Sequence, residues 1–379
     1  MIKSNEWCDT RYLSPFSPYQ YVLVFRPYFS SEHQHLFLNN NVYLAAYDYK
    51  KSKAGFDVFD CIGDHLSEDL IDQLRKRQAL FVFDMGMEGN WNDFPIDRSV
   101  NNTIQKYNLP SDCICVLTGT TSPPRYQDLN FLYFPKLMML AHRSNFEYLK
   151  NSYDRRKILT DEHHGYYFSA MSLRPRYWRA YAVYQLLNSS LAEKSIVSFC
   201  EKITGMEPKY MQDFLNARAP LLSEFEETPL RVGEGYKGEI ARNLHVNVLF
   251  HLSLETSQDL DTVFYTEKSF KALISETPML MWAMPGMNTT EFKALGFEPY
   301  DAWFDLSFDH EPDTKKRWHL LQDELLRVCN LLDDLTPEQR LEWSLQEPGL
   351  VKHNKRQFLS LINMHCNQFA DMLKRYFEK

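Results

Sequence analysis

The chain has 379 residues, two to three times the common domain size of about 100–150 residues, so we expect two domains. Apolar residues make up 44% and charged residues 24%, a composition that excludes disordered, collagen-like and linker-dominated chains. The net charge of −8 disfavours a protein whose whole surface neutralises nucleic-acid phosphates.

The cysteines and the first residues bear on the compartment. There are seven cysteines, an odd number, and no C-x-x-C pair, which favours reduced thiols over a disulfide framework or a zinc site. The first 14 residues lack the apolar core of a signal peptide, and no segment approaches the ~20 apolar residues of a membrane span. We therefore expect a cytoplasmic protein with no membrane span.

The first part of the chain alternates β-branched and aromatic runs with segments of helical periodicity, which predicts a parallel sheet covered by helices. The polar segment 151–164 is interpreted as a surface linker. Strands are predicted at 21–25, 42–46, 79–84 and 112–118, and helices at 66–76 and 99–107.

The rest of the chain repeats this pattern and then becomes helical. Strands are predicted at 165–171, 247–253 and 279–283, and helices at 174–187, 266–275, 315–332 and 354–377. The predicted fold class is α/β, with two Rossmann-like domains that face each other across a cleft and C-terminal helices that pack across them. The predicted boundaries are 1–160, 165–335 and, for helices that return toward the first domain, 336–379.

The segment 252–296 is the most informative for chemistry. A strand ends at Glu255, and a polar loop then leads to Tyr265-Thr266-Glu267-Lys268, which opens a helix with Thr266 as a candidate N-cap. A lysine in the first turn opposes the helix dipole, which is understandable if Lys268 neutralises an anion bound at the helix N-terminus. The alternative is a solvated surface lysine.

A second basic group opens the helix predicted at 174–187. Arginine forms a bidentate fork with phosphate, so Arg174, Arg176 and Arg179 are candidates for a second phosphate cation. If Pro175 is the first helical residue, Arg176 and Arg179 share a face. The alternative is a solvated basic helix start.

These motifs resemble the donor site of α-1,3-fucosyltransferases, which are inverting enzymes with two Rossmann-like domains in the GT-B arrangement. The family pattern has an acid followed by Asn, then Y-[VI]-T-E-K, a helix and a Val-Pro strand. This chain has Thr256 in place of the Asn and Thr277-Pro278 in place of Val-Pro. The chain also resembles glycosyltransferase-like proteins common in phage genomes, which combine the TEK motif with R-P-R-x-x-R, here 174–179, and D-x-x-x-E-G, here 84–89.

The resemblance implies a role for each donor-site residue. Lys268 would bind the diphosphate of a nucleotide-sugar with Thr266 beside it, and one of the three arginines would be the second cation. Glu267 would face the donor ribose or nucleoside, Glu255 would contact sugar or ribose hydroxyls, and Tyr265 would line the pocket. The enzyme would be a hexosyl- or fucosyltransferase-like glycosyltransferase, metal-independent and without a cofactor.

Transfer to a hydroxyl needs a base, and Glu88 is the first candidate, with Asp84 as the second. Both follow the strand predicted at 79–84, and Gly86 and Gly89 allow close approach of the backbone to a ligand. The resemblance also places a base-like Glu after a strand of the acceptor domain, here 1–160. The alternative is that Asp84 caps a turn and Glu88 is solvated.

The acceptor is a glycan or, as the phage-type resemblance implies, a hydroxymethylated base in DNA. A groove formed by Arg125, Arg143, Arg155, Arg156 and Lys157 is one way to offset the negative net charge for DNA. A non-catalytic binding or assembly protein on the same scaffold is the alternative function. His163-His164 and Asp259/Asp261 are weaker candidates for metal ligands.

Overall fold

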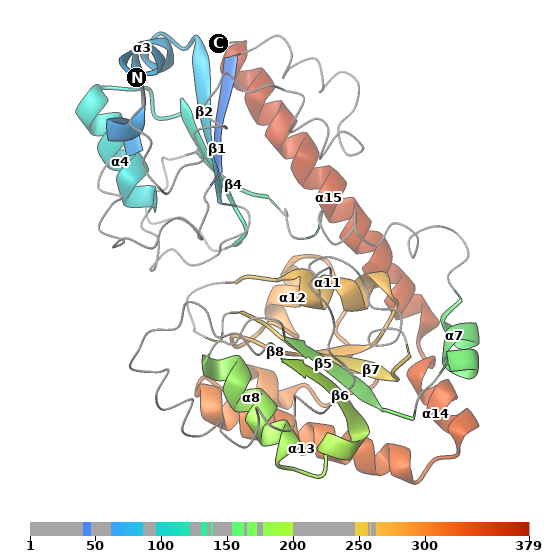
Figure 1. Cartoon of the computed structure of the whole chain (residues 1–379). Coiled ribbons are helices and arrows are strands. Elements are labelled where there is room, and N and C mark those ends of the chain that lie inside the picture. Colours follow the sequence, from blue (N-terminus) through green and yellow to red (C-terminus); the bar gives the residue numbers. More distant parts are fainter. Residues whose placement is uncertain are drawn as a thin grey trace. The chain divides into compact units, whose positions relative to one another are not determined.

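The structure is a computed structural model (Figure 1). The residues that it describes are 41–46, 62–85, 96–121, 130–134, 138, 154–162, 165–172, 177–199, 247–256, 258 and 263–378. The chain divides into two compact units. Unit 1 contains Met1–Met139, Asp261–Phe264 and Ser360–Lys379, and unit 2 contains Leu140–Leu260 and Tyr265–Leu359.

Unit 1 holds a parallel sheet in the order β1-β2-β3-β4. The strands are β1 (Asn41–Ala46), β2 (Ala79–Met85), β3 (Ile114–Thr118) and β4 (Asn130–Tyr133). β3 is buried along its whole length, as a parallel strand covered on both faces must be. The predicted strands at 42–46, 79–84 and 112–118 are confirmed, whereas the one predicted at 21–25 lies outside the described residues.

The helices of unit 1 cover both faces of this sheet. The connection from β1 to β2 contains η3 (Ile62–His65) and α3 (Glu68–Arg75), and the connection from β2 to β3 contains α4 (Ile96–Tyr107). Consecutive right-handed crossovers between neighbouring strands place their helices on one face. The other face is covered by the later part of α15 (Pro348–Phe377), where Phe369 packs against Phe134 and the Tyr376 hydroxyl donates to Ala79 O at 2.8 Å (Figure 1).

Unit 2 holds a second parallel sheet, in the order β6-β5-β7-β8. The strands are β5 (Phe168–Ser172), β6 (Ser195–Phe199), β7 (Phe250–Leu254) and β8 (Met279–Trp282). The order does not follow the chain, because β6 lies on one side of β5 and β7 on the other. The structure thus shows mixed α/β architecture with two parallel sheets, compatible with the Rossmann-like fold class predicted from the sequence.

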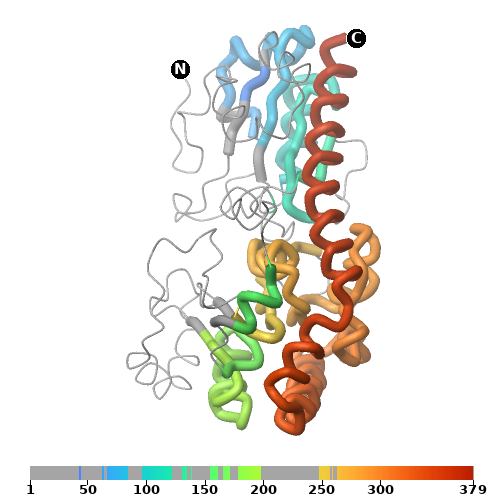
Figure 2. The backbone as a smooth tube through the Cα atoms, turned by 90° about the vertical axis from the view of Figure 1, so that its right-hand side faces the viewer, coloured from blue at the N-terminus to red at the C-terminus, as the bar shows by residue number. Residues whose placement is uncertain are grey.

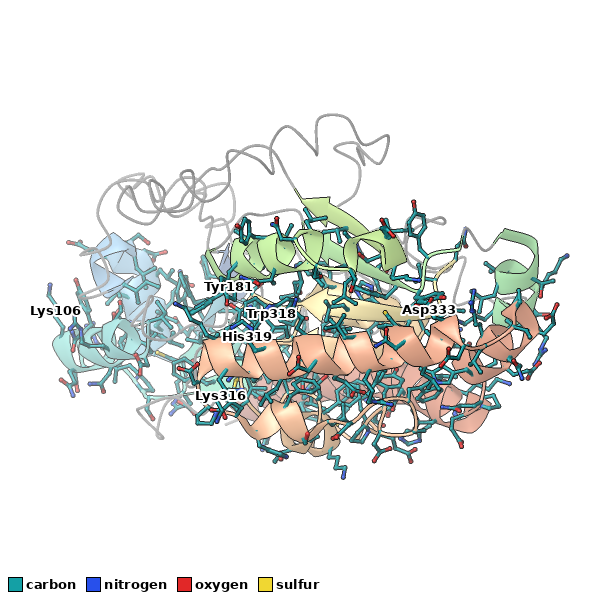
Figure 3. All side chains as sticks on the ribbon, turned by 90° about the horizontal axis from the view of Figure 1, so that it is seen from below. Lys106, Tyr181, Lys316, Trp318, His319 and Asp333 are labelled. Carbon is teal, nitrogen blue, oxygen red and sulfur yellow. The ribbon has the colours of Figure 1, made fainter. Side chains whose placement is uncertain are left out.

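Helices cover both faces of the unit 2 sheet (Figure 1). Helices α11 (Glu267–Ile274) and α12 (Thr290–Ala294) lie on one face, and α8 (Tyr177–Leu187) and α13 (Thr314–Asp333) on the other. Trp318 of α13 packs on Trp282 of β8 with ring centroids 4.8 Å apart. Figure 3 shows α13 from outside, with His319 near Tyr181 of α8, whose hydroxyl lies 3.3 Å from the imidazole Nε2.

Four elements differ from the sequence-based expectations. The segment interpreted as a linker contains α7 (Arg155–Glu162), because Arg155 and Leu159 share a buried face. Strand β6 and helix α14 (Pro337–Ser344) were not predicted, although α14 begins with a complete capping box between Thr336 and Gln339. Helix α15 begins at Pro348, before the predicted start at 354, and runs unbroken to Phe377 (Figure 2).

Arg155 is buried, so its predicted place in a basic surface groove is wrong. Its side chain is 5% exposed and donates to the carbonyls of Val248, Leu249 and Ser344 and to the Ser344 hydroxyl. The neighbouring Arg156 is exposed and forms a bidentate ion pair with Glu342. Arg155 is therefore a structural residue. No helix among the described residues is long and apolar enough to cross a membrane.

These two arginines provide a matched test of the fold. Replacing Arg155 by Met leaves several buried carbonyls without their donors, so we expect Arg155→Met to lower the free energy of unfolding by about 2–4 kcal/mol. Arg156→Met removes only an exposed ion pair and should cost less than about 1 kcal/mol. Urea denaturation of both variants checks this, and equal losses would contradict the structural role given to Arg155.

Candidate anion site at the carboxyl end of β7

The sheet of unit 2 has a topological switch point between β5 and β7. The chain leaves β5 through α8 toward β6 on one side, and leaves β7 through α11 toward β8 on the other. The two helices lie on opposite faces of the sheet (Figure 1). Ligands of open parallel sheets bind in the crevice outside the carboxyl ends of the strands at such a point.

The N-terminus of α11 is capped by Thr266, as predicted from the sequence. The Thr266 side chain accepts from the Lys268 backbone N–H, and its backbone is extended. The Lys268 ammonium turns back over this cap and donates to Thr266 Oγ1 at 3.2 Å and to Glu267 Oε1 at 3.0 Å. Lys268 is 8% exposed, so the structure contradicts the alternative of a solvated surface lysine.

Glu255 follows β7 and supports the same helix start from within. Its Oε1 atom accepts from the Thr266 backbone N–H at 3.1 Å and from the Ser269 hydroxyl at 2.6 Å. The side chain is fully buried, and its Oε2 atom has no hydrogen-bond partner among the residues that the structure describes. Glu255 therefore fixes the end of β7 to the first turn of α11, which is a positioning role for this carboxylate.

Arg179 comes from the opposite helix, α8, and reaches the same strand end. Its Nε atom donates to Leu254 O at 2.9 Å and to Glu255 O at 3.1 Å, and its NH2 group donates to Thr256 Oγ1. The side chain is 2% exposed. Arg179 thus braces the carboxyl end of β7. Arg174 and Arg176, the other two arginines of the cluster, lie outside the described residues.

The charges at this strand end interact strongly. Burial lowers the pKa of the Lys268 ammonium, and the nearby Arg179 charge lowers it further, whereas the carboxylates of Glu267 and Glu255 oppose this. Burial raises the pKa of the Glu267 carboxyl, but the charge and hydrogen bond of Lys268, together with the Lys271 charge, outweigh burial and lower this pKa to about 2. Glu267 is therefore ionised and ion-paired at neutral pH.

Tyr265 is positioned differently from a residue that lines an open pocket. Its side chain is 3% exposed, and its hydroxyl donates to Met287 O at 3.1 Å. Its ring packs near Phe270 and Phe292. In this structure Tyr265 joins α11 to the loop after β8.

Asp84 and Glu88 are the two carboxylates predicted to act as the base. Asp84 lies in β2, one residue from its carboxyl end, but its side chain is not among those described. Glu88, His163, His164, Asp259 and Asp261 lie outside the described residues. Within the part of the chain that is described, no three His, Cys, Asp or Glu side chains are grouped to hold a metal ion.

Sequence reasoning missed two residues that shape this region. Ser269 carries the hydroxyl that holds Glu255. Arg317 of α13 is 1% exposed and donates to Ala283 O after β8 and to Gln258 O. Arg317 is one residue from Trp318 and four from Leu321, so all three lie on the apolar side of α13. This spacing is the sequence signal that could have predicted the burial of Arg317.

A cavity of about 430 Å³ lies elsewhere in unit 2, near the amino end of β7, where Arg155 binds Val248 and Leu249. Its charged lining residues are Asp154, Arg155, Arg156, Glu276, Glu347 and Lys352. Three are acidic and three are basic, so this cavity favours neither sign of ligand charge. The end of β7 also has equal numbers of opposite charges, with Lys268 and Arg179 against Glu255 and Glu267, and it differs from the cavity in the helix N-terminus and the switch point that lie there.

Comparisons of the chain with protein-family models, with curated proteins and with solved structures found no match. The resemblance to α-1,3-fucosyltransferases and to phage-type glycosyltransferases therefore stays a prediction.

A buried histidine beneath the site makes stability depend on pH. His251 of β7 is fully buried with its Nδ1 atom 2.8 Å from Ser169 Oγ. Burial, followed by the charges of Lys271 and Lys268, lowers its pKa from 6.5 to about 3. The folded state disfavours the protonated imidazole. The stability that depends on a neutral His251 is therefore complete above pH ~6.5 and is lost as the pH falls toward ~3.

We expect the free energy of unfolding to fall by about 1.4 kcal/mol for each pH unit below ~6.5 through this group, or about 2 kcal/mol at pH 5. His251→Asn places an amide near the Nδ1 position beside Ser169 and removes the titration. Urea denaturation at pH 7 and pH 5 should therefore show a smaller difference for the variant. An identical difference in both proteins would contradict the assignment.

Proposed function

We propose that the chain is a glycosyltransferase that transfers a sugar from a nucleotide-diphosphate donor to a hydroxyl acceptor. Unit 2 would bind the donor and unit 1 the acceptor, in the manner of a GT-B enzyme. The observation that carries the proposal is the meeting of Lys268 and Arg179, from helices on opposite faces, at the end of β7 beside a helix N-terminus.

The chemistry of the leaving group fits these residues. A departing nucleoside diphosphate gains negative charge in the transition state, and fixed cations and helix N–H groups stabilise such charge. Lys268 is the more exposed of the two cations, so its ammonium would contact a phosphate oxygen. Arg179 would add positive charge while holding the strand end, so that the two cations would stabilise the leaving group in a metal-independent transfer.

The acceptor half of the reaction needs a group that removes a proton from the attacking hydroxyl. Glu88 and, as second choice, Asp84 would supply it, because Asp84 lies at the carboxyl end of β2, where parallel sheets bind ligands, and Glu88 follows this strand by three residues in the sequence. The acceptor would be a glycan or a hydroxymethylated base in DNA. Transfer assays with saccharides and with hydroxymethylated duplex separate the two.

Lys268→Ala tests the donor site directly. A nucleoside diphosphate or nucleotide-sugar at ~100 times its Kd stabilises the native state by about 2.7 kcal/mol, which is visible as a rise in Tm. We expect this rise for the wild type and its loss in Lys268→Ala. Lys315→Ala is a matched control, because Lys315 occupies the same position in the first turn of α13 and is exposed.

If no nucleotide raises the Tm of the wild type, or if Lys268→Ala responds like Lys315→Ala, the donor site is wrong. The alternative function, a non-catalytic binding or assembly protein on the same scaffold, is then favoured over the glycosyltransferase.

Glu88→Gln tests the base. The variant keeps the size of the side chain but accepts no proton, so we expect the transfer rate to fall at least ~100-fold. Donor binding, measured by calorimetry, should stay unchanged. If the rate falls in Asp84→Asn but not in Glu88→Gln, the roles of the two carboxylates are reversed. A normal rate in both variants contradicts the assignment of the base to either carboxylate.

A further inference from the structure

The cavity near the amino end of β7 is lined by charged groups that are already held in place. The Arg155 side chain is 5% exposed and is fixed by the carbonyls of Val248 and Leu249. Glu276 also lines the cavity, and its carboxylate pairs with the Lys355 ammonium at 2.7 Å, with both side chains about 15% exposed. Groups that are ordered before binding lose little entropy when a ligand arrives.

The backbone of Glu276 has a conformation that favours glycine. Its φ is 53°, in the left-handed region. Glu276 follows α11 in a Schellman cap, in which its N–H donates to Leu273 O and the Thr277 N–H donates to Ala272 O. Glycine adopts this conformation without strain, yet the chain has a glutamate whose carboxylate lies in the cavity wall. Strained residues concentrate at ligand sites, so this strain is a second observation that favours a ligand here.

Two exposed lining residues of opposite charge have no partner within the described part of the chain. Glu347 directly precedes α15, and Lys352 lies in the second turn of that helix. Neither side chain forms a hydrogen bond or ion pair with a described residue, including the other of the two. By contrast, Arg156 pairs with Glu342, and Asp154 accepts from a backbone N–H of α7. The cavity therefore offers one acid and one base to a ligand.

The size and the remaining lining restrict the ligand further. The volume of about 430 Å³ is at the lower end of the ~300–1,000 Å³ that is usual for ligand pockets, so the ligand is small. The lining also contains the apolar side chains of Leu345, Pro348 and Val351. A suitable ligand thus has a positive group, a negative group and a short apolar part.

We propose that this cavity binds a small zwitterion, an α-amino acid with an aliphatic side chain. Its ammonium contacts Glu347, its carboxylate contacts Lys352, and its side chain packs on Val351. A ligand with a single charge is attracted by one of the two charged groups and repelled by the other, so it binds more weakly than the zwitterion. The site lies at the other end of β7 from the proposed donor site and does not depend on it.

Calorimetry with leucine tests the proposal, with isocaproate and isopentylamine as analogues that each lack one of its charged groups. We expect leucine to bind the wild type at least ~10-fold more tightly than either analogue. Glu347→Gln and Lys352→Met should each raise the Kd for leucine at least ~10-fold. Glu338→Gln and Arg356→Met are the matched controls, because they change exposed positions of α14 and α15 outside the lining, and both should bind leucine like the wild type.

Three results would overturn the proposal. If leucine does not bind the wild type, the cavity is not an amino-acid site. If leucine binds but Glu347→Gln and Lys352→Met keep the wild-type Kd, it binds elsewhere. If one analogue binds as tightly as leucine, the ligand is not selected as a zwitterion. Circular dichroism verifies that the variants fold, and nucleoside diphosphate binding should be unchanged in them, so a failure here leaves the proposed function untouched.

Discussion

Positive charge buried at the end of a parallel strand is the constraint on which unit 2 depends. Moving an ammonium or guanidinium out of water is costly unless hydrogen bonds and opposite charges compensate for it. Arg179 meets this requirement with the backbone carbonyls of Leu254 and Glu255, and Lys268 meets it with Thr266 and Glu267. The compensation ties α8, β7 and α11 together at one point, so the groups that stabilise the strand end are the same groups that are proposed to bind the donor phosphates.

Strand order determines where this point lies. In unit 1 the strands follow one another in chain order, and the connecting helices share a face. In unit 2 the order β6-β5-β7-β8 separates the helices that follow β5 and β7 onto opposite faces of the sheet. The second arrangement brings cations from two helices, Lys268 and Arg179, to one strand end. This is the physical reason for assigning the anion site to unit 2.

The features of the fold and the site that depend on residues close together in the chain were predictable from the sequence. The buried strands, the long amphipathic helices and the Thr266 cap each have a signal within a few residues. Lys268 was recognisable because a lysine in a first helical turn opposes the dipole. The burial of individual arginines depends on contacts between residues far apart in the chain and was not predictable. The three arginines at 174, 176 and 179 look alike in sequence, and the structure shows the burial of Arg179 through carbonyls some 75 residues away. The assignment of Arg155 to a basic groove was wrong because its hydrogen-bond partners are also far away in the sequence. They are Leu249, directly before β7, and Ser344 of α14.

The most direct measurement is a ³¹P NMR titration of a nucleoside diphosphate with the wild type and with Lys268→Ala. Direct contact between the ammonium and the diphosphate changes the electron density at phosphorus. The account predicts that the phosphorus resonances shift with the wild type and stay at their free positions with Lys268→Ala. Equal shifts with both proteins would place the phosphates elsewhere and contradict the assignment of the end of β7 as the donor site.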